Sequence, residues 1–175
     1  PDLARRAEAA GIALITIHGR TRCQFYKGEA DWLAIADVSQ AVDIPVIANG
    51  DITNGQTART AMQAAQSAGV MIGRGAQGRP WLLAQVAAAL EGRAPATAPP
   101  VREALHDMVC GHYEAMLGFY GVDLGLRVAR KHLGWYMQAA GTAAAVRRAI
   151  LTSASPSQVT GLLRRAFTTN LEAVA

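Results

Sequence analysis

The sequence is poor in cysteine and has no long hydrophobic run. Its two cysteines, Cys23 and Cys110, are too few for a disulfide scaffold, so a reducing compartment such as the cytoplasm is the expected location. No apolar run approaches the roughly 18 residues needed to cross a bilayer, so no membrane partner is expected. The first ten residues contain four charged side chains instead of an apolar core, and they show no export signal.

Positive charge exceeds negative charge, and the excess is uneven along the chain. The net charge is +4 and the isoelectric point is about 9.5. Residues 101–175 carry eight Lys/Arg against five Asp/Glu, whereas residues 1–100 are nearly balanced. A basic C-terminal part favours a polyanionic partner, although so small an excess also suits an ordinary solvated surface.

Short apolar segments alternate with helical patterns over residues 1–93. Patterns of buried strands occur at 13–18, 46–48 and 69–73. Helical spacing is found between and around them, at 3–10, 32–42, 53–68 and 80–90. This alternation predicts an α/β fold with a parallel sheet covered by helices, either doubly wound or a barrel.

A Pro/Ala-rich stretch at 94–100 is typical of a linker and predicts a domain boundary. Beyond it, residues 101–175 show no strand pattern, and their helical patterns predict an all-α helical bundle. The expected helices are 101–120, 124–140, 142–151 and 156–174. Because the chain begins at Pro1 inside a helical pattern, we expect it to be a fragment.

Two of the strands end in glycine-containing turns, Asn49–Asp51 and Gly73–Gly75. Glycine lets the backbone approach a ligand closely, and the N-terminus of a following helix favours an anion. Arg74 could grip a phosphate with two N–H groups. Since barrel enzymes often bind phosphate at the loops after their last two strands, we predict a phosphate site here. Glycines that merely end strands are the alternative.

Residues Gly73–Gly78 also match the G-x-G-x-x-G fingerprint of dinucleotide-binding proteins. That fold needs a second strand with an acidic residue about 20 positions further on. Glu91 stands near this spacing, but it lies in an Ala-rich helical pattern just before the linker. The dinucleotide interpretation is therefore rejected.

The loop after the first strand is dense in cations and hydrogen-bond donors. His18, at the strand end, could donate to a cofactor ring or phosphate, or it could serve structure alone. Arg20, Arg22 and Lys27 are candidate contacts for an anionic substrate, with solvated loop charges as an equal alternative. Cys23 is interpreted as a structural cysteine, because no base stands near it in the sequence.

Four motifs, taken together and in this order, resemble those of the bacterial tRNA-dihydrouridine synthases. They are HGRTRCQFYKGEADW (18–32), PVIANGDI (45–52), GVMIGRGAQGRPWL (69–82) and RVARKHLGWY (127–136). The resemblance covers nearly the whole chain. It implies the C-terminal part of an FMN-binding TIM (β/α)8 barrel over 1–93 and a helical tRNA-binding domain over 101–175.

The resemblance also implies a reaction and a set of contacts. NADPH reduces the flavin, the flavin passes a hydride to a uracil ring of tRNA, and a cysteine supplies the second proton. Such a protein would be cytoplasmic, would need no metal and would be monomeric at full length. The positions that match the family's FMN contacts are His18, Asn49, Gly50, Asp51, Gly73 and Arg74.

The segment 124–140 predicts a helix with two faces. One face is a buried apolar stripe, made of Leu126, Ala129, Leu133, Met137 and Ala140. The other face carries Arg127, Arg130 and Lys131, which together with Arg20 are the predicted RNA-binding residues. Residues 127–148 contain five Lys/Arg and no Asp/Glu, a patch that could bind tRNA phosphates, with a solvated helix face as the alternative. Gly134 interrupts this helix at a cost in stability, and we expect it to allow close approach of another backbone.

The departures from the family concern the missing half of the barrel. A TIM barrel needs about 250 residues, whereas residues 1–93 supply three strands that match the last three of eight. The family's catalytic cysteine belongs to an earlier segment, and neither Cys23 nor Cys110 stands at the matching position. The catalytic residue is therefore unknown, and we expect this chain alone to retain flavin weakly and to show no turnover.

Two other functions stay open at this stage. A non-catalytic RNA-binding module would use only the helical part, and residues 101–175 would then bind tRNA without residues 1–93. Another FMN-barrel oxidoreductase, acting on a small molecule, would show no affinity for tRNA at low salt.

Overall fold

The chain divides into two compact units. The computed structural model describes residues 1–25, 27–95 and 98–168. The first unit comprises residues 1–76 and 80–97, and the second comprises residues 77–79 and 98–175.

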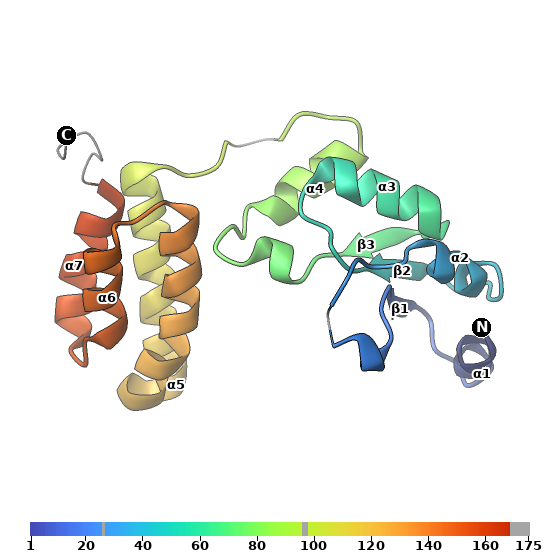
Figure 1. Cartoon of the computed structure of the whole chain (residues 1–175), viewed down its shortest axis with the longest axis horizontal. Coiled ribbons are helices and arrows are strands. Elements are labelled where there is room, and N and C mark those ends of the chain that lie inside the picture. The colour runs from blue at the N-terminus through green and yellow to red at the C-terminus, as the bar shows by residue number, and fades with distance from the viewer. Residues whose placement is uncertain (26, 96–97, 169–175) are drawn as a thin grey trace. The chain divides into compact units, whose positions relative to one another are not determined.

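The first unit alternates helices and strands (Figure 1). Its helices are α1 (Asp2–Ala9), α2 (Leu33–Ser39), α3 (Gly55–Ala65) and α4 (Leu82–Leu90). Its strands are β1 (Ile15–His18), β2 (Val46–Asn49) and β3 (Gly69–Met71). Two 3-10 turns, η1 (Arg22–Gln24) and η2 (Arg74–Ala76), follow β1 and β3. This order confirms the predicted α/β fold.

The three strands form one parallel sheet in the order β1-β2-β3. His18 of β1 is in register with Asn49 of β2, and Asn49 is in register with Met71 of β3. The parallel sheet is therefore confirmed, and all three strands end at the same edge. The loops that leave this edge hold the residues of the predicted phosphate site.

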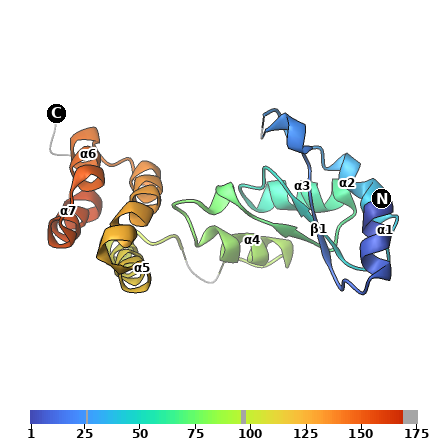
Figure 2. The ribbon, with the colours of Figure 1, turned by 90° about the horizontal axis from the view of Figure 1, so that it is seen from below.

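Helices cover one face of the sheet. Val46 and Ala48 of β2 are buried against Ile35 of α2 and Ala65 of α3. Helices α2, α3 and α4 pack on one another in sequence, and Figures 1 and 2 show α3 and α4 running side by side. Since side chains alternate between the faces of a strand, Asn49 points away from this helical layer.

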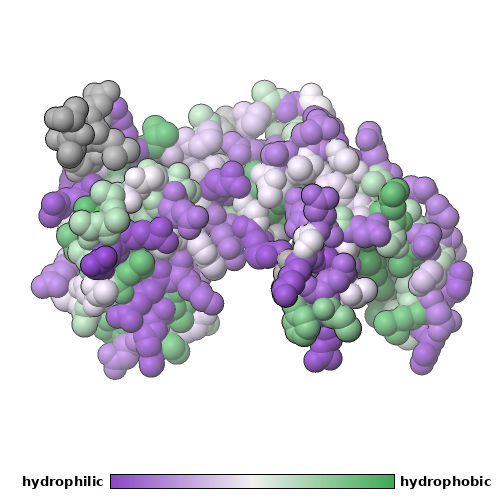
Figure 3. Space-filling model, viewed as in Figure 1, coloured by the Kyte–Doolittle hydropathy of each residue, from purple (hydrophilic) through white to green (hydrophobic). Residues whose placement is uncertain are grey.

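The outer strands of the sheet are paired on one side only within the described residues. Large apolar side chains of this unit are exposed, and green hydrophobic residues are open to view in Figure 3. The exposed large apolar side chains of this unit include Leu3, Ile12, Leu14, Phe25, Leu33 and Met71. The described part of the chain thus contains three strands where a closed TIM barrel has eight.

The described part of the second unit is helical. It contains α5 (Arg102–Ala139), α6 (Ala144–Thr152) and α7 (Pro156–Thr168). The backbone of α5 is non-helical at Gly121, with φ 73° and ψ 167°, between the two helices expected at 101–120 and 124–140. The chain folds back there, since a Cβ at Gly125 would lie 2.9 Å from the Cα of Leu117. The end of the helix expected at 156–174 and linker residues 96–97 lie outside the described residues.

One hydrophobic core joins these three helices. Tyr113 from the first half of α5, Ile150 of α6 and Leu163 of α7 are all buried in it. The predicted stripe faces this core: Ala129, Leu133 and Met137 are buried, and Leu126 and Ala140 pack against them. The 3.6-residue spacing of these side chains was therefore sufficient to predict their burial. None of the helices in the described ranges is long and apolar enough to cross a membrane.

Candidate functional site

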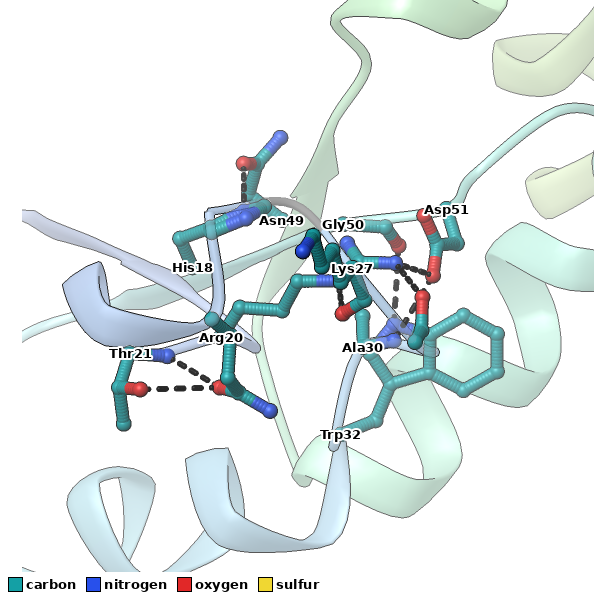
Figure 4. A network of polar contacts seen from close by, with 11 residues as sticks. His18, Arg20, Thr21, Lys27, Ala30, Trp32, Asn49, Gly50 and Asp51 are labelled. Atoms are coloured by element: carbon teal, nitrogen blue, oxygen red, sulfur yellow. Dashed lines mark hydrogen bonds and ion pairs between the residues drawn. The ribbon is translucent and has the colours of Figure 1, made fainter.

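The site is built at the carboxyl edge of the sheet, where a polar relay joins the three strands. Figure 4 shows its contact between His18 and Asn49. The Asn49 side-chain Nδ2 donates to the Met71 carbonyl oxygen over 2.7 Å. Its Oδ1 then faces the His18 ring, 2.6 Å from Nδ1. Asn49 therefore ties the end of β2 to the ends of both neighbouring strands.

This relay sets the proton position on His18. Because Asn49 Oδ1 can only accept, His18 Nδ1 carries the hydrogen. In the neutral ring, Nε2 is then the acceptor, so it can receive a hydrogen bond but cannot donate one to a phosphate. His18 could donate to an anion through Nε2 only as a protonated imidazolium. The donor role expected from the sequence therefore requires the charged ring.

Arg20 and Asp51, each two residues beyond the end of its strand, form an ion pair. The Arg20 Nη2 lies 2.5 Å from the Asp51 Oδ2, and the Arg20 side chain is only 3% exposed. The same guanidinium donates to the carbonyl oxygens of Lys27 and Gly28, and the Ala30 amide donates to Asp51 over 2.7 Å. These contacts give Arg20 and Asp51 a structural role in holding the 19–31 loop. The RNA contact expected of Arg20 stays a prediction, but its side chain is enclosed here.

The pKa of the Asp51 carboxyl is lowered from its usual 3.8. Partial burial opposes this by favouring the neutral acid, but hydrogen bonds from Arg20 and the Ala30 amide, with the charge of Arg20, outweigh it. The charge of Arg74 contributes in the same direction, so this second cation lies near the same carboxylate. Two arginines, Arg20 and Arg74, thus act on the same carboxylate at this edge.

Glycines allow the 19–31 loop to lie on the strand ends. A Cβ at Gly50 would lie 2.6 Å from the Ala30 Cβ, and one at Gly19 would lie 3.0 Å from the same atom. Gly50 also has a φ of 124°, which side chains disfavour. Loop packing therefore explains Gly50 without any ligand. Gly73 differs, because the space where its Cβ would stand is empty for 4 Å around.

The two predicted phosphate turns lie together. Asn49 and Met71 are paired, and η2, which follows Gly73, packs on the backbone of Ile52 and Thr53, where a Cβ at Gly75 would overlap. Neither turn leads straight into a long helix. The residues 52–54 precede α3, whose first turn is capped by the Asn54 side chain, and five residues separate η2 from α4. The contribution of helix N-termini to this site therefore stays a prediction, and the turns themselves offer further backbone N–H groups.

Comparison with known proteins decides the family. A family model described as "Dihydrouridine synthase (Dus)" matches residues 1–172. The chain belongs to the dihydrouridine synthase family. The domain of this family is a TIM barrel, which agrees with parallel strands followed by helices.

Relatives of this chain are found in bacteria. A "Probable tRNA-dihydrouridine synthase" of Rhodobacter capsulatus is 57% identical over 166 residues, covering 95% of this chain and 50% of that protein. One of Rickettsia conorii is 45% identical, covering 98% of this chain and 52% of its own length. A "tRNA-dihydrouridine synthase B" of Xanthomonas axonopodis pv. citri is 41% identical, covering 95% and 50%. The chain spans about half the length of these relatives.

The two cysteines of the chain belong to different units. Cys23 is exposed in η1, whereas Cys110 is buried in α5 with its sulfur 3.3 Å from His106 Nε2. Burial raises the pKa of the Cys110 thiol, and the nearby Glu114 and Asp107 raise it further. A protonated thiol is a weak nucleophile, so the His106 contact does not activate Cys110. Within the described ranges, no group of three His, Cys, Asp or Glu side chains is placed to hold a metal ion.

The three predicted RNA-binding residues of the helical unit, Arg127, Arg130 and Lys131, are exposed on α5. Gly134 is buried one turn further on. Among the described residues, and apart from the α5 backbone around it, only the Arg147 side chain of α6 comes within 4 Å of the position of its missing Cβ, at 3.9 Å. The close approach expected at Gly134 therefore comes from a guanidinium, and the expectation of a neighbouring backbone was wrong. Sequence spacing could not reveal Arg147, because it lies on another helix.

Trp32, at the start of α2, connects this helix to the candidate site. Its Nε1 donates to the Gly50 carbonyl oxygen over 3.0 Å, and its ring packs between the two hydrophobic clusters of the unit. Trp32→Phe leaves that carbonyl without its donor and should lower the free energy of unfolding by about 1 kcal/mol. Urea unfolding followed by circular dichroism measures this. Leu33→Ala, at a neighbouring side chain that is 72% exposed, should change it by less than about 0.5 kcal/mol.

Proposed function

We propose that this chain is part of an FMN-dependent tRNA-dihydrouridine synthase, which uses NADPH to reduce specific uridines in tRNA to 5,6-dihydrouridine. The observation that carries the proposal is the shared edge of β2 and β3. There, the Asn49–Asp51 and Gly73–Gly75 turns lie together beside His18. The family membership of the chain supports the same reaction.

The residues at this edge suit the anionic end of FMN. Arg74 supplies a cation whose guanidinium can bind phosphate with two N–H groups, and Gly73 borders open space that a ligand can enter. The Asp51 carboxylate would repel a phosphate, but Arg20 already neutralises it. Asp51 and Gly50 therefore contribute backbone groups and loop shape, while Arg74 contributes charge.

Bound FMN supplies hydride chemistry that no side chain provides. The residues of the chain would bind the cofactor and orient the groups around it. The Asn49 relay fixes the His18 ring, which presents Nε2 as an acceptor in its neutral form. The family's catalytic cysteine belongs to an earlier segment of the barrel, and the raised pKa of Cys110 argues against a substitute role for that thiol.

The helical unit is proposed to bind tRNA through the exposed Arg127, Arg130 and Lys131. The proposed division is a barrel portion over 1–93, a linker over 94–100 and a tRNA-binding domain over 101–175. We propose a cytoplasmic enzyme that is monomeric at full length and needs no metal.

A chimera tests the proposed reaction. Residues 1–175 replace the matching half of the Rhodobacter capsulatus relative, which is 57% identical. We expect the chimera to bind FMN and to form dihydrouridine in tRNA with NADPH, as measured by mass spectrometry of digested tRNA. The chain alone should bind FMN weakly and form none. A folded chimera that binds FMN but leaves tRNA unchanged would contradict the proposal.

Arg74 can be tested in the same chimera. Arg74→Ala should weaken FMN binding by about 10- to 100-fold, the range of a lost charge-assisted hydrogen bond. Flavin fluorescence quenching measures this affinity. Arg22→Ala removes an exposed cation of η1 and serves as the matched control. Equal losses in the two variants would remove Arg74 from the proposed phosphate site.

A further inference from the structure

A row of cations on α5 is completed by a residue from another helix. Arg127, Arg130, Lys131 and Gly134 are spaced by three, four and seven residues, so they lie on one face of the helix. The first three are exposed cations, and Gly134 has no side chain to continue the row. Seven residues of helix extend over about 10 Å, so the row is a short strip.

Arg147 of α6 occupies the place beside Gly134. Its Nη2 lies 3.9 Å from the position a Cβ of Gly134 would take, and no other group of the described residues, outside the neighbouring helical backbone, comes within 4 Å. Arg147 is half-buried, in contrast to the exposed Arg148 that follows it. A larger side chain at residue 134 would compete with the guanidinium for this space.

The Arg147 guanidinium forms no ion pair within the described part of the chain. No hydrogen bond or ion pair joins its side chain to a described residue. No Asp or Glu occurs between Arg127 and Arg148, and α7, which packs on α6, has none either. A cation that is partly enclosed and uncompensated attracts an anion more strongly than a fully hydrated one.

We propose that Arg147, seated over Gly134, is a further phosphate-binding residue, which extends the cationic strip of α5 onto α6. Its ligand is the phosphodiester backbone of RNA, because a guanidinium binds two phosphate oxygens at once and the strip repeats positive charge along a line. This inference rests on the proposed binding of tRNA by the helical unit.

The test measures binding of fluorescently labelled tRNA to the whole chain by anisotropy over a series of salt concentrations. Arg147→Gln should weaken binding by about five-fold and lower the slope of log K against log salt by about 0.7 to 0.9. Arg148→Gln removes the same charge from the next residue and should change affinity by less than half as much on a logarithmic scale. Equal effects of the two variants, or no effect of Arg147→Gln, would overturn the inference.

Substitutions at Gly134 provide a second, independent arm. Gly134→Ala adds a Cβ at an ordinary contact distance from Arg147 and should bind tRNA as the unmodified chain does. In Gly134→Leu the leucine side chain would displace the Arg147 guanidinium, so this variant should bind tRNA as weakly as Arg147→Gln does. Circular dichroism checks that its helical content is unchanged. If the unmodified chain binds no tRNA, both this inference and the proposed RNA binding fail. If Lys131→Gln weakens binding but Arg147→Gln does not, this inference alone fails.

Discussion

Asp51→Ala should destabilise the first unit by about 2 kcal/mol. The substitution leaves the Arg20 guanidinium, whose side chain is 3% exposed, without its carboxylate, and it also removes the acceptor for the Ala30 amide. Loss of one partner from a fully buried ion pair costs about 3–5 kcal/mol. Because Asp51 is 34% exposed, water can replace part of the interaction, and the smaller figure is expected. Urea unfolding followed by circular dichroism measures the change.

The variant Asp51→Asn separates charge from hydrogen bonding. It keeps an oxygen acceptor for Arg20 and Ala30, so its loss should be smaller than that of Asp51→Ala. Asp37→Asn, at an exposed carboxylate of α2, is the matched control and should be nearly neutral. If Asp51→Ala were no more harmful than the control, the ion pair would not hold the loop.

The same ion pair predicts a pH dependence. The folded chain lowers the pKa of Asp51 below 3.8, so folding favours its ionised form. This contribution to stability is fully present above about pH 3.8 and is lost as the pH falls through the folded pKa. The difference between the unmodified chain and Asp51→Asn should therefore stay constant from pH 7 to about 5, and should shrink below about pH 3.8. A difference that grew on acidification would contradict the direction of the pKa shift.

Replacing Arg127, Arg130 and Lys131 together by glutamine should weaken tRNA binding by about 100-fold or more at low salt. Each exposed cation that binds a phosphate releases counterions, so each substitution should lower the slope of the salt dependence by about 0.7 to 0.9. The triple variant should therefore have a slope that is smaller by roughly 2 to 3. Anisotropy titrations of labelled tRNA across salt concentrations provide both quantities.

The control for this triple variant changes the same charge elsewhere in the helical unit. Arg148, Arg164 and Arg165 are exposed on α6 and α7, and their joint replacement by glutamine also removes three positive charges. If binding depended on net charge alone, both triple variants would lose the same affinity. A much smaller loss of tRNA affinity in the control would place the interface on α5. Equal losses would show that the α5 cations are no specific part of the tRNA-binding site.

The sequence carried enough information to predict the parallel sheet and the edge that holds the candidate site. Buried parallel strands have a distinctive run of β-branched residues, and parallel strands must end at a common edge. The turns at Asn49–Asp51 and Gly73–Gly75 therefore had to lie near each other once both strands were identified. Gly121, where the helical pattern breaks, was equally clear as a point where α5 changes direction.

The ion pair of Arg20 with Asp51 was missed, although the sequence contained a signal for it. His18-Gly19-Arg20 and Asn49-Gly50-Asp51 follow two neighbouring parallel strands, and His18 is in register with Asn49. Residues two positions beyond a registered pair fall opposite each other when both loops leave in the same direction. Arg20 was interpreted as an isolated loop cation, and its partner Asp51, 31 residues further along the chain, was not connected with it.

The position of Arg147 beside Gly134 was not predicted, for a different reason. Spacing within one helix predicts which side chains share a face, but it says nothing about a side chain contributed by another helix. Gly134 was recognised as a place for close approach, and only the packing of α6 shows which group approaches.

The sheet also determines how the isolated chain should behave at high concentration. Each outer strand offers a row of backbone N–H and C=O groups that could pair with a second molecule, and exposed apolar side chains lie close to these strands. Lateral strand-to-strand association would satisfy those groups and cover that surface. Light scattering should therefore increase with concentration, and the chain should precipitate more readily than the chimera, where further strands cover both borders.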